Sequence, residues 1–200
     1  MTLFTTATHS LSCGVPALLL CLLTTCPALA LAPANASGQD HSSTMQLNQS
    51  PAEVVFSPHQ SPMLQRIRSI DAAKQSVLLA AYAFSHKDVA VALQRASKRG
   101  VRVFVVADAG SAKQGYSAIQ FLANESIPVR INERYAILHH KFAVFDERDV
   151  WTGSENFTSS AKKRNAGNAL LLRNQPQLAK QYGLEWRRLW YEGSDVTPKY

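Results

Sequence analysis

The sequence predicts an α/β sandwich with a central mixed sheet flanked by helices on both faces. From residue 53 onward, short apolar runs alternate with stretches whose apolar residues recur at helical spacing. The chain has 200 residues, and about 150 residues suffice for one well-buried core. Hydrophobic residues make up 46% and charged residues 18% of the sequence, which is typical of a globular protein rather than a disordered one.

Three elements open this alternation. Residues 53–56, with the sequence Glu-Val-Val-Phe, are expected to form a short strand. Residues 62–73 repeat apolar side chains every three or four positions, which predicts a helix. Residues 77–84 are apolar throughout, which indicates a strand buried on both faces of the sheet.

The next helix and strand end at recognisable residues. A helix is expected from residue 87 onward and stops at Gly100. The following strand, residues 101–108, ends on Asp108. Asp108 therefore lies at the kind of strand end where loops of open α/β sheets commonly carry function.

The remaining elements follow the same alternation. Residues 115–124 are expected to be helical, and residues 177–192 close the chain as an amphipathic helix. Between these two helices the sequence predicts extended segments at 127–131, 137–145, 150–153 and 169–173.

The N-terminal segment has the features of an export signal. No charged side chain precedes Asp40, and an apolar stretch ends in small residues, as in a secretory signal peptide. We expect cleavage after Ala30, or as late as Ala36, and hence a periplasmic or secreted protein without stable membrane association. The alternative is an uncleaved membrane anchor, because residues 14–32 approach spanning length.

The chain is accordingly divided into a signal peptide at 1–30, a flexible linker at 31–50 and one folded domain at 51–195. The linker is expected from its small and polar residues. All three cysteines belong to the signal segment: Cys13, Cys21 and Cys26. A mature chain would contain no thiol, which excludes disulfides, cysteine catalysis and zinc–thiolate sites.

The folded domain is basic. All 21 Lys and Arg and all 14 Asp and Glu residues lie beyond the first 39 positions, so the net charge of +7 belongs to the rest of the chain. Together with a pI near 9.5, this balance favours attraction of a polyanion. A modest positive charge also serves solubility alone, and composition does not separate the two roles.

Residues 139–156 carry the chemistry. Six of them fall at the spacing H-x-K-x4-D-x6-G-S-x-N: His139, Lys141, Asp146, Gly153, Ser154 and Asn156. A histidine can attack phosphorus and form a phosphohistidine that water hydrolyses. Lys141 balances the phosphate charge, and Ser154 and Asn156 donate hydrogen bonds to its oxygens. Gly153 lets the backbone approach a ligand closely. These residue types can break a phosphodiester without a metal.

The expected strand at 137–145 distinguishes between two adjacent histidines. Side chains alternate faces along a strand, so His139 and Lys141 point the same way and His140 points opposite. This selects His139 as the reactive imidazole. The same alternation turns Asp146 away from the phosphate, which predicts a supporting role for it.

The spacing resembles the HKD signature of the phospholipase D superfamily, and the chain is similar to its small single-motif bacterial members, the Nuc-type endonucleases. The resemblance covers about residues 53–173. It implies an α/β fold, no metal and an active site built from two HKD motifs. Because no second His-x-Lys occurs, it implies a homodimer in which two copies of His139 face one another across a two-fold axis. One is the nucleophile and the other the general acid. Lys141 and Asn156 of both subunits hold the phosphate, with Ser154 in support.

One position departs from the family pattern. Relatives often carry Glu two residues after an Asn equivalent to Asn165, where the Glu orients the catalytic imidazole, but this chain has Gly167 there. A histidine without its carboxylate partner loses orientation and part of its pKa tuning. Glu155, acidic where relatives tend to be apolar, is the candidate substitute.

Three functions are compatible with these residues. We favour a non-specific endonuclease acting on DNA or RNA, because the basic run after the motif supplies sequence-independent phosphate contacts. That run consists of Lys162, Lys163 and Arg164. The less favoured alternative for it is a solvated helix face. The alternative is a phospholipase D-type hydrolase of phospholipids, which could share every catalytic residue. The third function, suggested by the missing Glu, is a catalytically silent nucleic-acid-binding module. No cofactor is expected.

Overall fold

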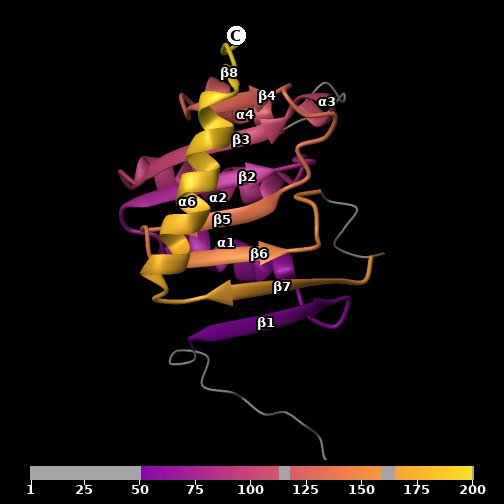
Figure 1. The fold of residues 1–200 in the computed structure, drawn as a ribbon, viewed down its shortest axis with the longest axis vertical. Coiled ribbons are helices and arrows are strands. Elements are labelled where there is room, and N and C mark those ends of the chain that lie inside the picture. The colour runs from indigo at the N-terminus through magenta and orange to yellow at the C-terminus, as the bar shows by residue number, and fades with distance from the viewer. Residues whose placement is uncertain (1–50, 113–117, 159–164, 200) are drawn as a thin grey trace, which may run out of the picture. The chain divides into compact units, whose positions relative to one another are not determined.

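A computed structural model describes residues 51–112, 118–158 and 165–199. These residues form one mixed sheet with helices on both faces, which confirms the predicted α/β sandwich (Figure 1). The signal peptide and linker predicted before residue 51 lie outside the described residues. The predicted nucleic-acid-binding run, Lys162, Lys163 and Arg164, also lies outside them.

The described elements are as follows. The strands are β1 (Ala52–Ser57), β2 (Ser76–Ala81), β3 (Arg102–Asp108), β4 (Val129–Asn132), β5 (Lys141–Phe145), β6 (Asp149–Gly153), β7 (Gly167–Leu172) and β8 (Ser194–Asp195). The helices are α1 (Pro62–Ala72), α2 (Lys87–Lys98), α3 (Ala109–Ala112), α4 (Ala118–Asn124) and α6 (Pro176–Tyr191). The strand order is β1-β7-β6-β5-β2-β3-β4-β8. The pairs β2–β3 and β3–β4 are parallel, and the other neighbouring pairs are antiparallel.

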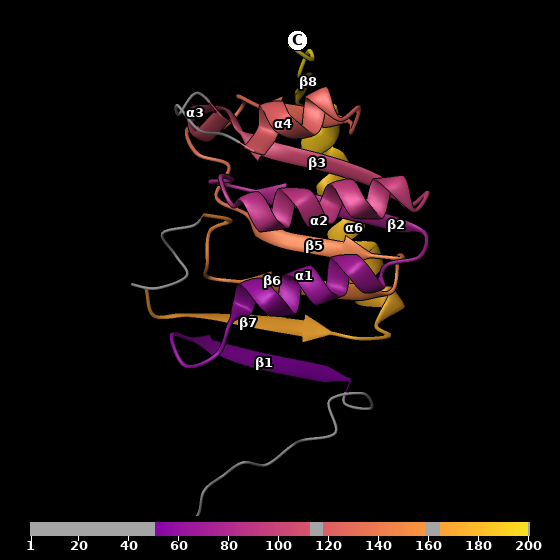
Figure 2. The same ribbon diagram turned by 180° about the vertical axis from the view of Figure 1, so that it is seen from behind.

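The sheet lies between two unequal helical layers. Helix α6 crosses one face, and α1, α2 and α4 cover the other (Figures 1 and 2). Strand β5 is buried at every position because both of its faces are covered. Phe142 and Val144 pack toward α6, whereas Ala143 and Phe145 belong to the core under the other helices. The indole nitrogen of Trp186 donates to the carbonyl of Leu79 at 2.9 Å, which ties α6 to the sheet.

Helices α1 and α2 begin where the sequence supplies capping side chains. The Ser61 hydroxyl accepts a hydrogen bond from the Leu64 backbone N–H at 3.2 Å, and Pro62 occupies the first helical position of α1. His86 caps α2 in the same manner, because its Nδ1 accepts from the Asp88 N–H at 3.2 Å. Across the described segments, no helix is both long and apolar enough to cross a membrane.

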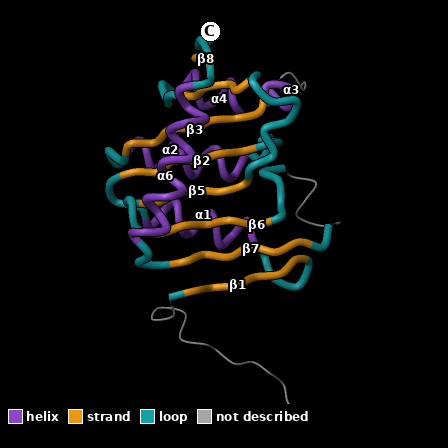
Figure 3. The backbone as a smooth tube through the Cα atoms, in the orientation of Figure 1, coloured by secondary structure: helices purple, strands orange, loops and turns teal. Residues whose placement is uncertain are grey.

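The prediction of a strand over 137–145 is wrong for its first four residues. Strand β2 ends at Ala81, which pairs with Lys141, so residues 137–140 have no neighbouring strand to extend along. This segment belongs to the loop between β4 and β5 (Figure 3). The loop is held instead by Asp108, whose Oδ1 accepts from the Leu138 N–H at 2.9 Å. The short elements α3 and β8 carry no sequence pattern that predicts them.

Candidate active site

The motif residues meet because β5 and β6 are antiparallel neighbours. The register pairs Phe142 with Thr152, so the start of β5 lies beside the end of β6. His139 and Lys141 therefore share one edge of the sheet with residues 153–156. The start of β7 lies at the same edge, where Gly153 pairs with Ala169.

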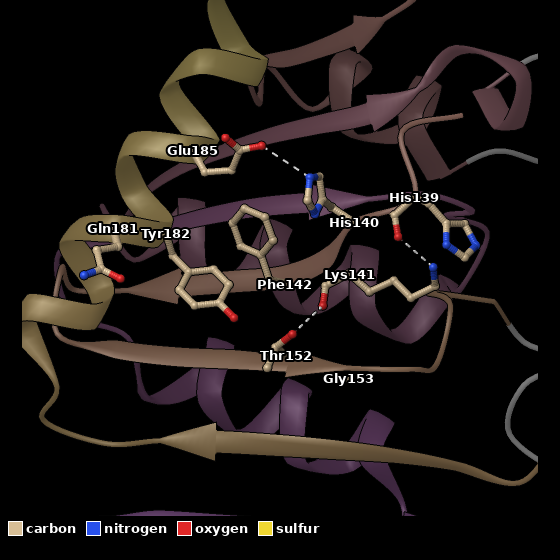
Figure 4. Close-up of a pocket in the computed structure, with 9 residues that line it drawn as sticks. All are labelled: His139, His140, Lys141, Phe142, Thr152, Gly153, Gln181, Tyr182 and Glu185. Carbon is tan, nitrogen blue, oxygen red and sulfur yellow. Dashed lines mark hydrogen bonds and ion pairs between the residues drawn. The ribbon is translucent and has the colours of Figure 1, made fainter. Parts of the chain in front are cut away.

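His139 is exposed at this edge. Its ring packs against Tyr82, with 4.9 Å between the ring centroids. The Lys141 ammonium donates to the carbonyl oxygen of His139 at 2.9 Å, which fixes the backbone of the histidine (Figure 4). In the described part of the chain the His139 imidazole makes no hydrogen bond. The ring nitrogens are therefore free to meet a phosphate or a proton acceptor.

Lys141 places a cation next to the backbone of this histidine. The side chain is only 8% exposed, and its Nζ lies 5.4 Å from the centre of the Tyr82 ring. Burial lowers the pKa of Lys141 from its ordinary value of 10.5, because the charged form loses hydration. A weakly hydrated ammonium is well suited to bind an incoming phosphate.

Gly153 is required by a close approach between strands. A Cβ atom at this position would lie 2.4 Å from the Asn168 carbonyl oxygen. Ser154 is hydrogen-bonded to the same residue of β7. Its backbone N–H donates to the Asn168 carbonyl at 3.0 Å, and its Oγ accepts from the Asn168 N–H at 2.9 Å. The Ser154 hydroxyl thus keeps its proton available for donation to a ligand.

The two residues after Ser154 turn inward. Glu155 is 6% exposed, and its Cγ lies 2.8 Å from where a Cβ at Gly167 would stand. The carboxylate side chain therefore occupies space that a longer residue at 167 would need. The Asn156 Oδ1 is also buried and has no hydrogen-bond partner among the described residues.

His140 and His139 point to different sides. His140 Nε2 lies 3.3 Å from Glu185 Oε1 on α6, and its ring packs edge-on to Phe142 at 5.5 Å between centroids. Figure 4 shows His140 directed toward the helix and His139 at the other side, near the Lys141 ammonium. His139 therefore lies beside Lys141, whereas His140 lies beside Glu185.

Asp146 lies at the far end of β5. Its carboxylate accepts hydrogen bonds from the backbone N–H groups of Lys74, Gln75 and Ser76 at 2.7–3.1 Å. Burial alone would raise the pKa of Asp146, but these hydrogen bonds and the charge of Arg148 outweigh it and lower the pKa. The residue therefore anchors the connection between α1 and β2, at the opposite end of β5 from His139 and Lys141.

Two pockets adjoin the histidine. One, of about 440 Å³, lies between α6 and the β5–β6 pair (Figure 4). It is lined by His139, His140, Lys141, Phe142, Thr152, Gly153, Gln181, Tyr182 and Glu185. The other, of about 390 Å³, lies between the loop before β5 and Arg188 and Leu189 of α6. Within residues 51–112, 118–158 and 165–199, no group of three or more His, Cys, Asp or Glu side chains is placed to hold a metal ion.

Two residues near the site were not singled out from the sequence as functional. Tyr82 supports both His139 and Lys141, and Arg66 lies buried beneath residues 151–157. One feature of the sequence could have drawn attention to Arg66. It follows Met63 by three positions on the face of α1 predicted to be buried, where a charged residue needs a partner.

Comparison with known proteins identifies the family. The family described as "Cardiolipin synthase, PLD-like domain" matches residues 66–190. The chain therefore belongs to the PLD-like family, a family of phosphodiester hydrolases, and the resemblance inferred from the motif is confirmed.

Relatives of the chain bear two kinds of name. A protein named phospholipase D from Rickettsia conorii is 34% identical over 146 residues, which cover 73% of this chain and 72% of the relative. The mitochondrial cardiolipin hydrolase of Homo sapiens is 35% identical over 134 residues, which cover 66% of this chain and 53% of the relative.

Among solved structures, the crystal structure of Nuc from Salmonella typhimurium, a phospholipase D family member, is 36% identical. Its TM-score is 0.71, with 73% of this chain and 97% of that chain covered. NucT from Helicobacter pylori has the same fold at 21% identity and a TM-score of 0.66, covering 72% of this chain and 98% of that chain.

Proposed function

We propose that this chain is a metal-independent endonuclease that hydrolyses DNA or RNA through a phosphohistidine intermediate. The observation that carries the proposal is the exposed imidazole of His139 beside the buried ammonium of Lys141, at the edge of an open pocket. The net charge of +7 supports a polyanionic substrate.

The reaction has two steps. A ring nitrogen of His139 bonds to phosphorus as the bond from phosphorus to the leaving oxygen breaks, and a second imidazole donates its proton to that oxygen. Water then attacks the phosphohistidine, gives a proton to the second imidazole and releases the first. Lys141, Ser154 and Asn156 hold the non-bridging oxygens and stabilise the charge that develops on them.

The second imidazole is supplied by a second copy of the chain in this proposal. The sequence contains one His-x-Lys, and His140 is directed to Glu185 instead. An exposed His139 at the sheet edge is accessible to a two-fold related copy. The active unit is therefore a homodimer with one shared site. We also propose that the protein is exported, as its N-terminal sequence predicts.

Phospholipid hydrolysis is the second candidate. The observation in its favour is the 34% identity to a protein named phospholipase D. The catalytic residues would be the same, because both reactions cleave a phosphodiester. Substrate choice would then depend on the pockets beside His139 rather than on the motif.

The test is incubation of the purified chain with plasmid DNA, RNA and vesicles of phosphatidylcholine or cardiolipin, each with EDTA present. We expect nucleic acid cleavage that persists in EDTA, is abolished in His139→Ala and is retained in His140→Ala, the matched control. Cleavage of phospholipid alone would favour the second candidate. Loss of activity in EDTA, or full activity of His139→Ala, would contradict the mechanism.

A further inference from the structure

An arginine lies buried beneath the phosphate-binding segment. Arg66 of α1 is 1% exposed, and its guanidinium carbon lies 3.9 Å from the ring centroids of both Trp151 and Phe157. These two aromatic residues flank residues 152–156 in the sequence. The guanidinium is therefore held between the two rings, behind the segment that contains Ser154 and Asn156.

Glu155 is the acidic residue whose charge acts on this arginine. It is 6% exposed, and its carboxylate opposes the effect of burial on Arg66. Burial lowers the pKa of Arg66 to about 9, with Glu155 raising it in part, so the guanidinium stays charged at neutral pH. Arg66 Nε and Nη2 and Glu155 Oε1 have no hydrogen-bond partner within the described residues, so the two side chains act on one another through their charges and not through a hydrogen bond between these atoms. Buried charges of this kind persist only when an opposite charge is near.

Gly167 makes room for this arrangement. A Cβ at that position would lie 2.8 Å from Glu155 Cγ and 3.1 Å from Ser154 Oγ. Any larger residue would push the carboxylate and the serine hydroxyl out of place. Arg66 of α1, Glu155 in the loop after β6 and Gly167 of β7 are thus sterically or electrostatically linked.

We propose that Arg66 and Glu155 form a buried charge pair that positions Ser154 and Asn156 for phosphate binding. The proposal rests on the proposed function of the site. Glu155 lies between the two phosphate ligands in the chain, so a shift of its side chain moves both. A buried ion pair stabilises a fold no better than apolar residues of similar volume. Positioning of the adjacent ligands gives this pair a role that apolar packing could not supply. Arg66 and Glu155 are positioning residues and do not touch the substrate.

The test compares Arg66→Met, Arg66→Lys, Glu155→Gln and the Arg66→Met/Glu155→Gln double variant with the wild type. Four quantities are measured: kcat and KM for the substrate that the wild type cleaves, the thermal unfolding temperature, and the affinity for inorganic phosphate by titration calorimetry. Arg95→Met is the matched control, because Arg95 forms an exposed ion pair with Asp71 at 2.8 Å on the outer surface of α2 and α1.

We expect Arg66→Met and Glu155→Gln each to lower kcat by about 10- to 100-fold, since small misplacements of binding groups have effects of that size. Arg66→Lys keeps the charge and should recover part of the loss. The double variant should be no slower than either single variant, because the two residues act as one unit. Phosphate affinity should fall in the same variants, and Arg95→Met should leave kcat and phosphate affinity unchanged.

A lower unfolding temperature with unchanged kcat and phosphate affinity would overturn the proposal, because it would assign the pair to the fold alone. Additive losses in the double variant would also overturn it. If Arg66→Met does not fold, Arg66→Lys and Glu155→Gln carry the test. A wild type that cleaves no phosphodiester would contradict the proposed function. The phosphate affinities of the two single variants and the double variant, compared with that of the wild type, would still decide whether the pair positions the site.

Discussion

Two neighbouring histidines acquire opposite surroundings. Both are exposed, but His140 lies beside Glu185 of α6 and Phe142 of β5, whereas His139 packs on Tyr82. The two side chains diverge although residues 139 and 140 lie in the loop before β5, which begins only at Lys141.

Lys141 gives a prediction about alkaline pH. Because burial lowers the pKa of Lys141, its charge is lost at a lower pH than that of an exposed lysine. We expect kcat/KM to fall as pH rises through that value, since the phosphate loses its buried cation. In Lys141→Arg the guanidinium stays charged, so the alkaline fall should move to higher pH even if the maximum rate is lower. Profiles of kcat/KM against pH check this, and an identical alkaline limb in both proteins would exclude Lys141 as its source.

Asp146 gives a prediction about stability. Its folded pKa is lowered, so its stabilisation is present above the unfolded value of 3.8 and is lost as pH falls through the folded value. Asp146→Asn should lower the free energy of unfolding by about 1–3 kcal/mol near neutral pH, because backbone N–H groups lose their charged acceptor. Asn tolerates the positive φ of 52° at this position. Urea unfolding measures the difference.

The difference between wild type and Asp146→Asn should shrink at acid pH, where the carboxyl is protonated in both states. The folded variant should keep its kcat, because Asp146 lies at the opposite end of β5 from His139. A constant stability difference at all pH values would show that the loss is steric and not electrostatic.

At the scale of elements, local patterns predicted most strands and helices. Because helices cover both faces of the sheet, its strands carry apolar runs and its helices carry apolar residues at helical spacing. The closing helix was expected at 177–192 and is observed at Pro176–Tyr191. The strand expected at 77–84 ends at Ala81 instead, and the one at 137–145 begins at Lys141. The end of β2 and the start of β5 depend on one another, because each strand can extend only as far as its partner does. A single run of sequence does not contain that information.

The site was predictable where its chemistry is local. The spacing from His139 to Asn156 is contiguous enough to be recognised without a structure. The direction of Glu155 and the burial of Arg66 depend on how α1 packs against β6, and β7 decides what stands beside Gly167. Such contacts join segments far apart in the sequence, so no periodicity encodes them.

The β6–β7 contact gives a prediction at the element scale. In Gly153→Ala the new methyl group would lie 2.4 Å from the Asn168 carbonyl, so the strands must separate. We expect a loss of about 1–3 kcal/mol in stability, as for other overpacked sites, and a lower kcat because Ser154 moves with the strand. Chemical unfolding and turnover assays measure both.

Gly183→Ala is the control for this prediction. An added Cβ there meets nothing within 4 Å, and the residue lies inside α6. Replacing a mid-helix glycine by alanine should raise stability by about 0.5–1 kcal/mol, with kcat unchanged. A loss of stability in Gly183→Ala equal to that in Gly153→Ala would show that close strand contact is not the cause.

At the scale of the whole molecule, one copy of the motif supplies one His139, whereas the proposed two-step reaction requires two imidazoles. The proposed shared site predicts how activity depends on composition in mixtures. When wild type and His139→Ala subunits exchange, a mixed dimer contains one His139, which cannot both attack phosphorus and protonate the leaving oxygen. Activity should therefore fall with the square of the wild-type fraction, because only pairs of wild-type subunits are competent.

Light scattering measures the dimer directly, and turnover across a series of mixing ratios measures the dependence on the wild-type fraction. His140→Ala subunits, which keep the reactive imidazole, should leave activity unchanged at every ratio. A linear dependence on the wild-type fraction would mean that each subunit works alone. The second proton-transfer group would then have to come from the same chain, and His140, beside Glu185 in the same pocket, would be the first residue to test.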